Sequence, residues 1–295
     1  MPKKFRFDVN RKPIVGLMEP VEGEKAMKHG EELTRETIVR ALAEALDSLD
    51  YVHAFYEGGA AAFDRVDEWS DLDFYVVVGD DKVNDILAVI ERALETLSPI
   101  QLKYEPSHLE WPGLYQAFYK LAKANRYLLI DLVVLKTGSA EKFLQPEIHG
   151  DVVFHINKSD AIKPPPLDRV AFVRKLQERV KKLRARCDMS NDFVQKEINR
   201  HNDLEAIDLY HNLTLAMLVE VLRIRHNPLH YDFGMHYVRY ELPAEALRRL
   251  SHLYFVRDGA DLQRKYDEAT QWLRAEMSEI REDDVERLVE SHLRS

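Results

Sequence analysis

The run of three prolines at Pro164–Pro166 divides the sequence into two stretches with different residue patterns. Proline cannot continue a helix or a central strand, so no regular element crosses this run. Before it, short apolar runs typical of strands alternate with amphipathic helical stripes, whereas after it only the helical spacing recurs. We therefore expect an α/β domain over residues 1–160 and an all-helical domain over residues 161–295.

The first stretch predicts a layer of strands and helices. A helix is expected over residues 34–48, with Thr34 as its cap, and a second one after Asp80 or Asp81. The segment from Gly138 to Asp168 is expected to be irregular. Strands are expected at YVHAFYE (51–57), DLDFYVVV (71–78), IQLKYE (100–105), LYQAFYKL (114–121) and RYLLIDLVVLK (126–136).

The second stretch predicts helices throughout. One helix is expected from about residue 167 to 187, and a longer one from about 191 to 226 that stops before Pro228. The only cysteine, Cys187, leaves no intrachain disulfide, which indicates a reducing compartment. No secretory signal or membrane-spanning run is evident, so we expect a cytoplasmic protein without a membrane partner.

The charge is uneven along the chain. Lys and Arg balance Asp and Glu from residue 161 onward, so the formal net charge of −9 lies within residues 1–160. An acidic front half argues against nucleic acid as a partner, because binding to phosphates requires clustered Lys and Arg.

Two acids one residue apart, Asp71 and Asp73, stand at the start of a predicted strand. Residues i and i+2 of a strand project to the same face, so the two carboxylates would repel each other unless a cation lay between them. Asp131 lies within LLIDLVVLK, where an acid among apolar residues needs a partner. Three acids from two neighbouring strands predict a site for two Mg²⁺ ions, with Mn²⁺ as the alternative metal.

The turn before these acids contains Gly58 and Gly59. Because glycine has no side chain, the backbone N–H groups of such a turn can approach a phosphate closely. A Gly-Gly turn also suits any tight connection, so this feature gains weight only beside the acids.

The string GGAAAFDRVDEWSDLD (58–73), followed by a strand and a later strand aspartate, resembles the polymerase-beta-type nucleotidyltransferase superfamily. More closely, it resembles the two-domain aminoglycoside and lincosamide nucleotidyltransferases. The resemblance covers residues 51–79 and 126–136 best. It implies a mixed sheet with flanking helices, followed by a helical substrate-side domain. The family's motif positions correspond here to Gly58, Gly59, Asp71, Asp73 and Asp131.

The resemblance implies a reaction as well as a fold. Asp71, Asp73 and Asp131 would be the catalytic and metal-binding residues, and Gly58, Gly59 and Ala60 would bind the nucleotide. A nucleoside triphosphate, with ATP expected first, would give its nucleoside monophosphate to a hydroxyl of a small-molecule acceptor, releasing pyrophosphate. Related enzymes often build the site at a homodimer interface.

The helical stretch supplies two candidate contacts for the triphosphate. Lys196 and Arg200 lie four residues apart on the predicted long helix, with Asp203 one turn further on the same face. If that face borders the cleft, the two cations would meet phosphates; otherwise the three residues form a solvated, salt-bridged stripe.

Several alternatives stay open. Ala60 replaces a serine that many family members use for the triphosphate, and Asp64 adds a negative charge nearby, so an inactive, nucleotide-binding family member is one of them. Another is a toxin of the same fold that modifies tRNA. A glycosyltransferase fits less well, because its nucleotide-binding half would precede the acids, and a haloacid-dehalogenase-type phosphatase would place them at the end of a strand.

Overall fold

The computed structural model describes residues 33–106, 114–190 and 192–294. The chain separates into two compact units, Met1–Pro166 and Leu167–Ser295, so the division falls at the end of the proline run. The expected fold class is confirmed, because a mixed six-stranded sheet with helices is followed by a helical unit.

The described part of the first unit contains one mixed sheet in the order β3-β4-β5-β2-β1-β6. Its central pair, β2 and β5, runs parallel, and every other neighbouring pair in this sheet is antiparallel. The strands are β1 (Val52–Glu57), β2 (Leu72–Val78), β3 (Ile100–Tyr104), β4 (Tyr115–Leu121), β5 (Ile130–Lys136) and β6 (Val153–Asn157).

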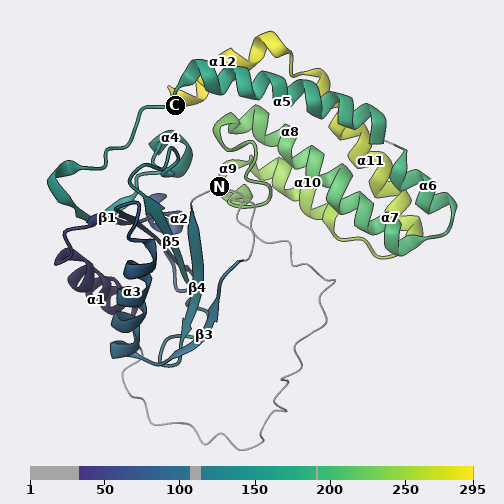
Figure 1. The fold of residues 1–295 in the computed structure, drawn as a ribbon. Coiled ribbons are helices and arrows are strands. Elements are labelled where there is room, and N and C mark those ends of the chain that lie inside the picture. The colour runs from purple at the N-terminus through teal and green to yellow at the C-terminus, as the bar shows by residue number, and fades with distance from the viewer. Residues whose placement is uncertain (1–32, 107–113, 191, 295) are drawn as a thin grey trace, which may run out of the picture. The chain divides into compact units, whose positions relative to one another are not determined.

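The longer helices of this unit, α1 (Arg35–Asp47) and α3 (Val83–Leu97), cover one face of the sheet (Figure 1). Thr34 caps α1 as predicted, since its hydroxyl accepts a hydrogen bond from the Thr37 N–H. Each helix buries one apolar stripe against alternate strand residues, which form the main core of the unit. The helical members of this core are Ile38, Leu42, Leu46, Ile86, Ile90 and Leu94.

A smaller apolar cluster lies on the other face of the sheet. Alternate strand residues such as Tyr56, Val77 and Val133 form it together with Phe143 and Leu144. These last two residues precede α4 (Pro146–His149), a single helical turn. The expectation that residues 138–168 are irregular is wrong in part, because this segment contains α4 and supplies β6 as an edge strand paired with β1.

All the regular elements described in the second unit are helices. Helix α8 (Ala216–His226) is buried on most sides, and the ion pair between Arg223 and Glu241 anchors the segment that follows this helix. The α-helices are α5 (Arg169–Ser190), α6 (Phe193–Asn199), α7 (Asp203–Leu209), α8 (Ala216–His226), α9 (Val238–Glu241), α10 (Ala244–Tyr254), α11 (Gly259–Ser278) and α12 (Val285–Leu293).

The single long helix predicted for residues 191–226 is wrong. Helix α6 ends at Asn199, the backbone of His201 takes a left-handed conformation (φ 57°), and α7 begins at Asp203. A π-helical turn, Tyr210–Leu215, then joins α7 to α8. A non-glycine residue with positive φ interrupts helical hydrogen bonding, so His201 marks the break.

Candidate functional site

The parallel pairing of β2 with β5 places two of the three predicted acids side by side. Asp73 and Asp131 are direct partners in the register of these strands. Paired residues of neighbouring strands point to the same face of a sheet, and the strands lie about 4.8 Å apart. Both aspartates are partly exposed.

The alternation of the two strands determines which face carries the acids. Leu72 and Ile130, also paired, are buried in the core beneath α1 and α3. The neighbouring residues Asp73 and Asp131 therefore project to the opposite face of the sheet, away from the core beneath α1 and α3. The apolar residues next to each acid in the sequence thus belong to the core, and the acids themselves lie on the other face of the sheet.

The glycine turn approaches the Asp73 carboxylate closely. The Gly58 N–H donates a hydrogen bond of 2.9 Å to the backbone oxygen of Asp73. Gly59, with φ 56°, opens the single helical turn α2 (Gly59–Ala62), and a Cβ atom at this position would lie 1.8 Å from Asp73 Oδ2. The absence of a side chain at Gly59 is therefore required both by its backbone conformation and by the carboxylate.

The other loop positions singled out from the sequence lie just after Gly59. Ala60 is in α2, and its backbone oxygen accepts a hydrogen bond of 2.9 Å from the Arg65 N–H. Asp64 is exposed and adopts a left-handed conformation (φ 52°), which aspartate tolerates better than most residues. Asp64 thus serves the turn that follows α2.

Asp71 precedes the first residue of β2 and is held by its backbone. The Arg35 guanidinium, from α1, donates hydrogen bonds to the backbone oxygens of Asp71 (2.9 Å) and Ser70 (3.4 Å). Arg35 also forms an ion pair with the buried carboxylate of Glu57, at the end of β1. These contacts fix the position at which the loop enters β2.

Gln116, on β4, holds the carboxylate of Asp131. Its amide Nε2 donates a hydrogen bond of 2.8 Å to Asp131 Oδ1. A donor on the neighbouring strand restricts the rotation of the carboxylate and so orients it.

Tyr75 lies close enough to both acids for their charges to affect the pKa of its phenol. Burial raises the pKa of its phenol well above the ordinary value, and the carboxylates of Asp73 and Asp131 raise it further. The ring of Tyr75 stacks on that of Tyr56 at a centroid distance of 5.2 Å. The Tyr75 phenol therefore stays neutral beside the two acids.

The described residues contain no group of three or more His, Cys, Asp or Glu side chains arranged to hold a metal ion. What the structure does bring together is the pair Asp73 and Asp131, with Asp71 two residues before Asp73 in the sequence.

The two cations predicted to meet phosphates lie on α6 of the second unit. Lys196 is exposed, and its Nζ lies 5.3 Å from the ring centroid of Phe193. Arg200 is the C-terminal cap of α6 and forms an ion pair with Glu197. The predicted shared face with Asp203 is wrong, because the chain turns at His201 before Asp203 begins α7.

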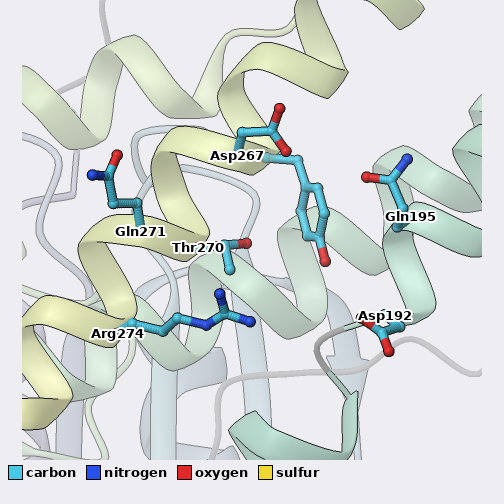
Figure 2. Close-up of a pocket in the computed structure, with 7 residues that line it drawn as sticks. Asp192, Gln195, Asp267, Thr270, Gln271 and Arg274 are labelled. Carbon is cyan, nitrogen blue, oxygen red and sulfur yellow. The ribbon is translucent and has the colours of Figure 1, made fainter.

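A polar pocket of about 350 Å³ lies between α6 and α11. Figure 2 shows the Arg274 guanidinium extending from α11 on one side, with Asp192 and Gln195 facing it from the other. The buried Thr270 hydroxyl lies between them, next to the Tyr266 phenol. Lys196 and Arg200 are not among the lining residues, which are Asp192, Gln195, Tyr266, Asp267, Thr270, Gln271 and Arg274.

No helix in the described part of the chain combines the length and the apolar character needed to cross a bilayer.

Comparison with known proteins gives similarity to solved structures. No protein-family model matches the chain, and no curated protein matches it. A crystal structure of an aminoglycoside 6-adenyltransferase from Bacillus subtilis is similar over 88% of this chain and 97% of that chain, with 12% sequence identity and a TM-score of 0.25.

Proposed function

We propose that this protein is a metal-dependent nucleotidyltransferase. It would move a nucleoside monophosphate from a triphosphate, ATP first among them, to a hydroxyl group of a small molecule, with release of pyrophosphate. The observation that carries the proposal is the in-register pair of carboxylates, Asp73 and Asp131, with the backbone of Gly59 against one of them.

The pair fits magnesium as part of a ligand set. Mg²⁺ in enzymes of phosphate chemistry usually takes one or two protein carboxylates, and water and substrate phosphates complete its coordination. Asp73 and Asp131 supply two carboxylates on adjacent strands, and Asp71 is proposed as the third ligand from its spacing. A bound metal would neutralise charge on the phosphates during transfer.

The chain's own groups have separate roles in this proposal. The Gly58–Gly59 turn and Ala60 would let the phosphates approach the backbone, since no long side chain stands in the way. Asp131 would accept the proton of the acceptor hydroxyl, while the hydrogen bond from Gln116 orients its carboxylate. Lys196 and Arg200 are proposed as further phosphate contacts, with Arg200 the weaker because Glu197 already neutralises it.

A second candidate function is nucleotide binding without transfer. Two observations favour it: Ala60 has no hydroxyl to offer a phosphate, and the exposed Asp64 adds negative charge at the turn after α2. This candidate retains the glycine turn and the acidic pair but assigns them to binding alone.

The experiment that separates the two candidates is a screen for magnesium-dependent pyrophosphate formation. The full chain is incubated with each ribonucleoside triphosphate and a panel of hydroxylated small molecules, and a tRNA fraction is included as a separate acceptor. We expect pyrophosphate only when Mg²⁺, one triphosphate and a small-molecule acceptor are present together. Saturable triphosphate binding without pyrophosphate under any condition would favour the second candidate, and label transfer to tRNA would favour a toxin-type enzyme.

The hydrogen bond between Gln116 and Asp131 gives a testable consequence. Replacing Gln116 with leucine removes the donor and leaves Asp131 in place, so we expect transfer to fall about 10-fold to 100-fold and the Mg²⁺ requirement to rise. The measurement is initial-rate kinetics with a magnesium titration. Gln101→Leu, at an exposed position of the edge strand β3, is the matched control and should behave as wild type. Equal rates for both variants would remove Gln116 from the site.

A further inference from the structure

An exposed aromatic pair lies in the two loops that enter the strands of the acids. The side chains of Trp69 and Tyr127 keep 58% and 48% of their surface exposed. Their ring centroids are 5.0 Å apart at an interplanar angle of 72°, an edge-to-face contact. Large aromatic rings that pack mainly on each other present apolar faces to water, and such surfaces commonly bind a ligand.

Each ring is held by a turn of the same kind. The Trp69 N–H donates to Asp67 Oδ1 (3.0 Å), and the Tyr127 N–H donates to Asn125 Oδ1 (2.9 Å). In both loops the side chain of an Asp or Asn therefore fixes the backbone of an aromatic residue two positions later. Ser70 strengthens the first turn, since its hydroxyl also donates to Asp67 Oδ1 at 2.8 Å.

The pair lies at the end of the sheet where the acids are. Because β2 and β5 are parallel, the loops that precede them meet at the same end of the sheet, where both strands begin. A backbone hydrogen bond of 2.9 Å from the Leu72 N–H to the Leu129 oxygen joins the two chains directly after the loops. Trp69 is two residues from Asp71, and Tyr127 is four residues from Asp131.

Arg126 adds a positive charge to the pair. Its guanidinium carbon lies 4.9 Å from the ring centroid of Tyr127, and the side chain is exposed. Aromatic faces beside an arginine bind the flat rings of nucleic-acid bases, because every base has a π-face and the guanidinium stacks as well. Phosphates would not be favoured at the aromatic faces themselves.

We propose that Trp69 and Tyr127 form a stacking platform for the base of the bound nucleotide. This inference rests on the proposed function, since it places the base at the same end of the sheet as the acids that would hold the phosphates. Stacking is tolerant of base identity, so the platform contributes affinity more than choice between bases.

The test is equilibrium binding of the four ribonucleosides to the full chain in the presence of EDTA. Binding is measured by calorimetry and by tryptophan fluorescence. Nucleosides have no phosphate, so their binding does not depend on metal. We expect saturable binding that Trp69→Ala and Tyr127→Ala each weaken about 10-fold or more, whereas Trp69→Phe stays within about 3-fold of wild type. Tyr104→Ala, at another exposed aromatic of the same unit (53% exposed), is the control and should bind as wild type.

The outcomes separate this inference from the proposed function. Absence of saturable nucleoside binding, or equal affinity in Trp69→Ala and wild type, overturns the platform even if pyrophosphate is released. Platform-dependent nucleoside binding without pyrophosphate release in any condition upholds the platform and overturns the transferase.

Discussion

Replacing Asp73 with asparagine is expected to reduce nucleotidyl transfer on the order of 100-fold to 1,000-fold while the protein stays folded. The amide has nearly the same shape as the carboxylate but cannot supply its negative charge, so stabilisation of charge at the reacting centre is lost. The fold should be unaffected or slightly more stable, because the repulsion between Asp73 and its strand partner Asp131 is removed.

The measurement is magnesium-dependent pyrophosphate release, with thermal unfolding followed by circular dichroism. Asp81→Asn is the matched control: Asp81 is an acid just beyond the other end of β2, and its side chain is 85% exposed. It should keep wild-type rates. Near-normal turnover in Asp73→Asn would refute the assignment of the acidic pair to catalysis.

Replacing Gly59 with alanine is expected to damage both stability and activity. An alanine at φ 56° costs about 1 kcal/mol of unfolding free energy, and its Cβ would lie 1.8 Å from Asp73 Oδ2, so the carboxylate must move. A displacement of about 1 Å in a reacting group can lower a rate about 100-fold, and we expect a loss of that order.

Gly234 provides the control, because it has nearly the same backbone angle (φ 57°) but open space where the Cβ would be added. Gly234→Ala should lose about 1 kcal/mol of unfolding free energy and keep its transfer rate. The measurements are denaturant unfolding and initial rates for both variants. If the transfer rate of Gly59→Ala is within about 2-fold of that of Gly234→Ala, the close contact between Gly59 and Asp73 is not needed for transfer.

The parts of the fold that could be predicted from the sequence are those with a strong local pattern. The helix over 34–48 has a cap and an apolar stripe, and the strand of Asp73 has a long apolar run, so both appear within a few residues of their predicted limits. The neighbouring strand expected for Asp131 is also found, since β5 pairs with β2.

The parts that were missed depend on contacts between distant residues. Strand β6 is short and begins with the exposed Val153, and it is defined by its pairing with β1. The helix break at His201 could not be predicted from the sequence, because residues 199–203 (NRHND) include no proline or glycine. At the site, Tyr75 and Gln116 lie near the acids because strands pair, although the spacing of Tyr75, two residues after Asp73, could have placed it on the acidic face.

The position of the two carboxylates also depends on the register in which β2 pairs with β5. Asp131 faces Asp73 only while the two strands keep their observed alignment, in which Ile130 and Leu132 lie opposite Leu72 and Phe74. A shift of β5 by one residue would turn the Asp131 carboxylate into the hydrophobic core beneath α1 and α3. It would also place an aliphatic side chain beside Asp73. The core and the acidic pair therefore depend on the same strand alignment, so a mutation that misaligns the strands also separates Asp73 from Asp131.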